Sequence, residues 1–177
     1  CIPRVAYSVE QPVLTMINNV IATSIVLDFA NKMKVKRVIY SGSSSVVGNG
    51  DGPASPYGLQ KLVSELESKL YTSLYGLDTV TLRYFNVYSP CQKAEGPYAT
   101  AVAEDVVSAN IAAMERSTDF KGATYDIGTG SNISLNKIKD IAQEFFPEVV
   151  FDYTPPRHGD VFSTKADITP FMDESSW

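Results

Sequence analysis

The sequence predicts an α/β protein built on a mostly parallel sheet that helices cover on both sides. Segments with the apolar spacing of helices alternate along the chain with short β-branched segments, which is the pattern of βαβ units. Each short segment ends in small or turn-forming residues, as buried strands do. With 177 residues, of which 44% are hydrophobic and 20% charged, the chain has enough material for a compact core.

Four segments carry the spacing of amphipathic helices. The first spans residues 12–34, and its apolar positions predict one buried stripe, which consists of Leu14, Ile17, Ile21, Ile25 and Phe29. The second spans residues 56–75 and follows Ser55, a predicted N-cap. The third and fourth span residues 104–116 and 135–145.

Four short segments rich in β-branched or aromatic residues are predicted strands: 35–40, 79–87, 123–127 and 149–153. In open parallel sheets, ligands bind outside the carboxyl ends of the strands. We therefore expect the chemistry in the loops that begin at Ser41 and Val87.

Composition excludes several classes of function. Fifteen basic residues against 20 acidic ones give a net charge of −5, the wrong sign for a surface that neutralises phosphates of nucleic acids. Two cysteines, Cys1 and Cys91, and one histidine, His158, cannot assemble a disulfide framework or a Cys/His zinc site. No run of 18 apolar residues occurs, so we expect a soluble, cytoplasmic protein without membrane, metal or nucleic-acid partners.

One pair of residues suggests acid–base chemistry. Tyr57 and Lys61 are four residues apart at the start of a predicted helix, so both side chains lie on one face. A neighbouring ammonium and the positive end of a helix dipole both favour a phenolate, which would make the tyrosine a usable base. The chain has ten tyrosines, and one such pair arises easily by chance, so the pair alone is weak evidence.

The surroundings of that pair carry a family resemblance. Residues 39–48 read as a strand that runs into a serine-rich turn, residues 55–61 contain the Tyr-Lys pair, and residues 82–90 contain Leu-Arg-Tyr-Phe-Asn-Val-Tyr-Ser-Pro. Together with the segments 128–130 and 157–160, these resemble the extended short-chain dehydrogenase/reductase family, specifically its nucleotide-sugar 4-epimerases. The resemblance implies a Rossmann-like, doubly wound parallel sheet with a small C-terminal substrate-binding region.

The resemblance also implies roles for individual residues. It makes Tyr57 the catalytic base, Lys61 the residue that binds the nicotinamide ribose of NAD and depresses the tyrosine pKa, and Ser43 the serine that hydrogen-bonds the reacting oxygen. The implied NAD contacts are Asn18, Ser41, Tyr57, Lys61 and Tyr84. The implied contacts to a UDP-sugar are Ser43, Ser44, Asn86, Arg157 and Thr164. Plainer alternatives stay open: the serines form a flexible loop, and Asn86 and Arg157 are solvated surface residues.

The implied reaction is an isomerase reaction of carbohydrate metabolism. The C4 hydroxyl of a nucleotide sugar is inverted through a 4-keto intermediate, and NAD is retained because no net oxidation occurs. Related dehydratases carry an acidic pair after the strand, whereas Ser43-Ser44-Ser45 has no carboxylate, which favours the epimerase. A related dehydratase or reductase, and a non-catalytic fragment of the same fold, remain alternatives. A small residue at Thr164 is typical of relatives that admit N-acetylhexosamines.

The resemblance divides the chain into two parts. Residues 1–90 correspond to part of an NAD-binding Rossmann domain with the catalytic residues, and residues 91–177 to a mixed substrate-binding region. Its phosphate-binding glycine turn and first βαβ unit have no counterpart in the sequence, so we expect the working enzyme to be longer. The resemblance further implies a homodimer formed through the helices near 12–34 and 56–75.

Overall fold

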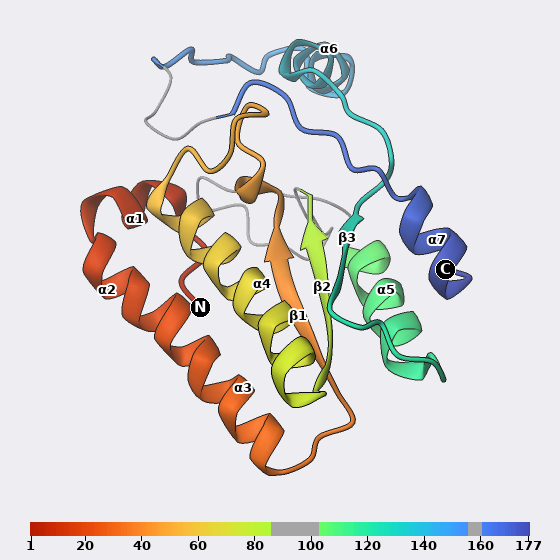
Figure 1. Cartoon of the computed structure of the whole chain (residues 1–177). Helices are drawn as coiled ribbons and strands as arrows, with labels where there is room; N and C mark the ends of the chain where they lie inside the picture. The colour runs from red at the N-terminus through yellow and green to blue at the C-terminus, as the bar shows by residue number, and fades with distance from the viewer. Residues whose placement is uncertain (86–102, 156–160) are drawn as a thin grey trace.

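A computed structural model describes residues 1–85, 103–155 and 161–177 of the protein. In these residues, three parallel strands form one sheet in the order β1-β2-β3 (Figure 1). The strands are β1 (Arg37–Ser43), β2 (Asp78–Tyr84) and β3 (Ala123–Ile127). The predicted α/β class with a parallel sheet is confirmed.

The predicted helices form with small changes at their ends. The elements are α1 (Val5–Glu10), α2 (Pro12–Met16), the π-helical turn η1 (Ile17–Ile21), α3 (Ala22–Lys32), the 3-10 turn η2 (Ser44–Val46), α4 (Pro56–Tyr75), α5 (Ala103–Glu115), α6 (Leu135–Phe145) and α7 (Thr169–Ser175). Helix α4 has the predicted bounds because Ser55 caps it by accepting a hydrogen bond from the Gly58 amide. Helices α1 and α7 were not predicted, since so few residues carry no clear periodicity.

The two faces of the sheet pack against different helices. Val80 and Leu82 of β2 point into an apolar core with residues of α5, β3, α7 and the loop between α5 and β3: Ala109, Ala113, Phe120, Ile127 and Phe171. The alternate residues of β2, such as Thr79 and Arg83, point to the other face and hydrogen-bond to α4. Helix α3 lies beside α4 on that face (Figure 1).

The predicted buried stripe of the first helix is wrong. All five of its residues are exposed, with Ile25 at 63% and Phe29 at 62%. The face of this helix that packs on α4 instead carries Thr15 and Asn19, which are buried and hydrogen-bonded. The apolar spacing identified the helix correctly but not the side that the rest of the chain covers.

The helical segment that carries this exposed face, Pro12–Lys32, is long enough and apolar enough to span a membrane, with a mean hydropathy of 1.6. It is the one such helix in the part of the chain that the structure describes. A single helix of this kind is weak evidence for a membrane segment, because core helices and signal sequences meet the same criteria.

The fourth predicted strand, residues 149–153, is also wrong: this segment is irregular. Val150 and Tyr153 are exposed, and the Tyr153 hydroxyl accepts a hydrogen bond from Lys139 Nζ of α6. A strand forms only where a neighbouring strand pairs its backbone groups, and β-branched composition alone supplies no such partner.

Candidate active site

The Tyr-Lys pair lies where the end of β1 meets the first turns of α4. The Ser8 hydroxyl of α1 accepts a hydrogen bond from the Tyr57 amide at 3.0 Å, so two caps, Ser8 and Ser55, fix the start of the helix. Gly58 allows the turn after β1 to approach closely, because a Cβ atom there would lie 2.4 Å from the Ser45 carbonyl oxygen. This contact brings the serine-rich turn against the amino end of α4.

Tyr57, Lys61 and Ser43 are brought together at this junction. The three residues are buried, with exposures of 8%, 5% and 9%. The Ser43 hydroxyl lies near enough to the Tyr57 phenol to lower its pKa. The Lys61 ammonium donates to the Ser41 carbonyl oxygen at 2.7 Å, and its nitrogen lies 6.0 Å from the centroid of the Tyr57 ring. The arrangement is that of an acid–base site with a phenol, a hydroxyl and a cation.

Burial controls the ionisation of both titratable groups. Burial raises the pKa of Tyr57, and Ser43 only partly offsets this. Burial also lowers the pKa of Lys61 to about 8. The net shift of the Tyr57 pKa in the protein alone is therefore upward rather than the expected depression, because burial outweighs the effect of Ser43.

The other predicted site residues are placed unevenly. Ser44 is buried in the turn beside Ser43, and the exposed Ser41 hydroxyl lies 3.4 Å from the Tyr84 hydroxyl. Thr164 lines a cavity of about 260 Å³ at the carboxyl end of the sheet. The other residues around this cavity include Val47, Asn49, Phe85, Asp126 and Lys165.

Three predictions receive no such support. Asn18 is exposed, and its side-chain amide donates to the Leu14 carbonyl of its own helix rather than reaching the site. Asn86 and Arg157 lie outside the described residues.

Sequence reasoning missed several buried residues beside the pair. Tyr40 of β1 places its ring centroid 5.0 Å from Lys61 Nζ. Glu65, one helical turn beyond Lys61, accepts two hydrogen bonds from Arg83 of β2, at 2.9 and 2.6 Å. The alternation of β1 and β2 was the available signal, because it directs Tyr40 and Arg83 to the face that α4 covers.

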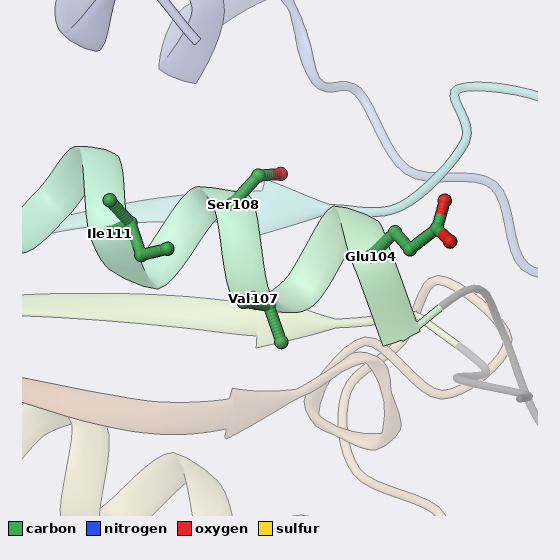
Figure 2. Close-up of a pocket in the computed structure, with 4 residues that line it drawn as sticks. All are labelled: Glu104, Val107, Ser108 and Ile111. Carbon is green, nitrogen blue, oxygen red and sulfur yellow. The ribbon is translucent and has the colours of Figure 1, made fainter. Parts of the chain in front are cut away.

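A second cavity, of about 320 Å³, lies on α5, which packs on the opposite face of the sheet from α4. Figure 2 shows that its lining comes from successive turns of this one helix: Glu104, Val107, Ser108 and Ile111. None of the predicted site residues borders it, so the candidate site is the junction of β1 and α4.

The junction fits the nicotinamide half of a dinucleotide. An ammonium has three donors, and within the described ranges only the Ser41 carbonyl receives one from Lys61, which leaves donors for the hydroxyls of a ribose. The eleven glycines include no G-x-G-x-x-G turn, so the 177 residues supply no such cradle for the pyrophosphate. No group of three His, Cys, Asp or Glu side chains in the described part of the chain could hold a metal ion.

A family model described as the NAD dependent epimerase/dehydratase family matches residues 2–104 of the chain. Among individual proteins, one from Methanocaldococcus jannaschii, assigned by inference as a UDP-glucose 4-epimerase, is 29% identical. The match covers 93% of this chain and 65% of that protein. The chain thus spans just under two thirds of the length of this relative.

Solved structures show the same fold. The UDP-N-acetylglucosamine 4-epimerase of Methanobrevibacter ruminantium, in complex with UDP-N-acetylmuramic acid, superposes with a TM-score of 0.88 at 26% identity, over 100% of this chain and 68% of that one. MoeE5, in complex with UDP-glucuronic acid and NAD, superposes with a TM-score of 0.91 at 27% identity, over 100% of this chain and 71% of that one.

Proposed function

The chain belongs to the NAD dependent epimerase/dehydratase family, whose solved members include complexes with NAD, and on that premise we propose that it epimerises C4 of a UDP-sugar. The observation that carries the proposal is the burial of Tyr57, Lys61 and Ser43 together at the carboxyl end of β1. UDP is the proposed nucleotide because the M. ruminantium and MoeE5 structures hold UDP-sugars.

In the proposed reaction, the Tyr57 phenolate takes the proton of the sugar C4 hydroxyl while the Ser43 hydroxyl holds the same oxygen. When bound, NAD would supply reversible acceptance of the C4 hydride. The reaction therefore proceeds through a 4-keto sugar and leaves no net oxidation. Tyr57 then returns the proton to the C4 oxygen once the hydrogen has been restored on the opposite face.

Lys61 supplies the charge that makes Tyr57 usable as a base. Its pKa of about 8 keeps most of the side chain protonated at pH 7. The ammonium lies over the phenol ring, so its positive charge stabilises the phenolate whenever the Tyr57 proton leaves. Burial opposes that ionisation in the protein alone, so a buried cation at this position is required.

Epimerisation is favoured over dehydration because the turn that follows β1 contains serines and no carboxylate. Expelling water from a sugar needs an acid and a base besides the hydride transfer. Thr164, beside the cavity at the carboxyl end of the sheet, is the proposed residue that admits an N-acetyl group, because its side chain is small.

The test is an assay of the full-length protein, purified and analysed for bound NAD, with UDP-glucose, UDP-galactose, their N-acetyl forms and UDP-glucuronate. Tyr57→Phe should reduce turnover by a factor of at least about 1,000 while leaving the fold intact, because the proton acceptor is lost. Tyr75→Phe, at the exposed far end of the same helix, is the matched control and should retain full activity. Bound NAD without turnover of any of these sugars would refute the epimerase proposal.

We also propose that two copies pair through the exposed apolar side chains of α2, η1, α3 and α4. On α4 these are Leu59, Leu66, Leu70 and Leu74, and on the neighbouring helix they are the five residues of the predicted stripe. In a dimer with two-fold symmetry, the same apolar patch of each copy packs against that of the other, and both patches are removed from water.

Sedimentation velocity of the full-length protein tests this pairing. The wild type and the control Lys36→Glu, at an exposed position outside these helices, should sediment as dimers, and Ile25→Glu as a monomer. A monomeric wild type would contradict the pairing. Recovery of the protein in membranes, abolished by Ile25→Glu, would instead assign the apolar face to lipid.

A further inference from the structure

Lys61 is a buried cation without a carboxylate partner among the described residues. Within the ranges that the structure describes, Lys61 donates one hydrogen bond, to the Ser41 carbonyl oxygen at 2.7 Å. A buried ammonium in these surroundings is strongly desolvated, which is why its pKa falls to about 8. The other groups that face the Lys61 nitrogen therefore influence what fraction of this side chain is protonated at neutral pH.

The nearest carboxylate on the same helix face is already engaged. Glu65 lies one turn beyond Lys61, but the guanidinium fork of Arg83 binds both of its oxygens, at 2.9 and 2.6 Å. Arg83 Nη1 also lies 3.9 Å from an oxygen of Asp126 on β3. The negative charge of Glu65 is thus balanced from β2 rather than from Lys61.

The ring of Tyr40 takes the place of a counter-ion. Its centroid lies 5.0 Å from Lys61 Nζ, closer than the Tyr57 ring at 6.0 Å. Tyr40 is buried in β1, and burial raises its pKa to about 12, so the ring is neutral wherever the protein is folded and working. What it offers the ammonium is the negative face of an aromatic ring, and this attraction is strongest where water is excluded.

We propose that Tyr40 is a positioning residue, whose ring face holds the Lys61 ammonium charged and in place between the Ser41 carbonyl and the Tyr57 ring. The effect on Lys61 follows from the contacts alone, and its consequence for turnover rests on the proposed epimerase function. The titratable groups that face the Lys61 ammonium are Tyr57 on α4 and Tyr40 on β1. The charged groups one helical turn further on bind one another: Glu65 of α4 accepts from Arg83 of β2, which also lies near Asp126 of β3.

The test changes the ring electronics without changing its shape. Tyr40 of the full-length protein is replaced by Phe and by Phe carrying one, two and three ring fluorines, because fluorine withdraws charge from the ring face. The pKa of Lys61 is measured by NMR titration of 13Cε-labelled lysine, with the resonance assigned from its loss in Lys61→Met. These fluorinated side chains keep the core packed, so the test does not depend on a variant such as Tyr40→Leu that leaves a cavity.

Tyr40→Phe should leave the Lys61 pKa within about 0.3 units of the wild type, and fluorination should lower it stepwise by about one unit in total. A Lys61 pKa that does not change with fluorination would overturn the proposal. So would an equal shift in Tyr40→Phe, since that result would assign the effect to the Tyr40 hydroxyl rather than to the ring face.

Activity separates this inference from the proposed function. A fall of the Lys61 pKa from about 8 to about 7 would halve the protonated fraction at pH 7, so kcat should fall about two-fold there and recover at pH 6, with KM unchanged. If the NMR trend holds in a protein without epimerase activity, the positioning role stands and the epimerase proposal fails. If the enzyme is active without that trend, only the role of Tyr40 fails.

Discussion

Helix α4 reverses the usual arrangement of a surface helix, in which the buried face is apolar and the exposed face is polar. The face that packs on the sheet and on α3 is mostly polar and buried: Tyr57, Gln60, Lys61, Ser64, Glu65 and Ser68. The opposite face is apolar and exposed, with Leu74 at 63% and Leu66 at 56%. Burying polar groups costs free energy unless each is hydrogen-bonded, so the inner face must be closely matched to its neighbours.

The hydrogen bonds of the inner face show how that match is made. Gln60 accepts from the Asn19 amide at 2.8 Å and donates to the Thr15 hydroxyl at 2.9 Å, which joins α4 to the preceding helix. The Ser68 carbonyl accepts from the Thr79 hydroxyl at 2.9 Å, which joins α4 to β2. Directional bonds of this kind fix the position of the helix along the sheet, and hence of Tyr57 and Lys61, more strictly than apolar packing would.

The largest effect should come from breaking the inner face at its ion pair. Arg83→Met leaves the carboxylate of Glu65 buried without its partner, and we expect a loss of about 3 to 5 kcal/mol in the free energy of unfolding. The double variant Arg83→Met/Glu65→Leu removes both charges and should recover most of that loss. Urea unfolding of the three proteins measures it, and a single variant as stable as the wild type would refute the importance of the pair.

A smaller, pH-dependent effect should follow from removing the buried cation. The pKa of Lys61 is about 8 when folded and 10.5 when unfolded, so the unfolded chain binds more protons between these values and wild-type stability rises across this window. Lys61→Met should therefore be about 2 to 3 kcal/mol more stable than the wild type at pH 7, and this advantage should vanish near pH 10.5.

Urea unfolding at the two pH values tests the Lys61 prediction. Lys69→Met, at an exposed lysine of the same helix, is the matched control and should follow the wild type at both. An advantage of Lys61→Met that is constant with pH would show that side-chain packing, rather than charge burial, separates it from the wild type. The raised pKa values of Tyr40 and Tyr57 affect the comparison only above pH 10, and equally in both proteins.

The smallest effect on folding should come from the outer face. Leu70→Ser removes an exposed side chain, so the free energy of unfolding of the dissociated chain should change by less than about 0.5 kcal/mol. If two copies pair through this face, the same variant should weaken their association, measured as a raised dissociation constant in sedimentation equilibrium. A large loss of stability at dilutions where the wild type is monomeric would contradict the assignment of Leu70 to an outer face.

The local features of the fold could be read from the sequence because neighbouring residues decide them. Ser55 and Pro56 start α4 at the predicted residue, and Gly76 ends it in the left-handed conformation, with φ 70°. The segment 123–127 forms β3 with the predicted bounds. The segment 149–153 was predicted wrongly because β-branched composition states a preference, while a strand also requires a partner.

The sequence by itself determined most of the periodic elements and the parallel α/β class, and its family resemblance indicated Tyr57, Lys61 and Ser43 as candidate catalytic residues. Only the tertiary structure decided which side of each helix is covered, because an apolar stripe has the same spacing whether it faces its own chain or another surface. It also decided the ionisation of the site. The pKa of Lys61 depends on burial, and that of Tyr57 depends on burial and on Ser43, and residues distant in the chain bury these groups only when the chain folds.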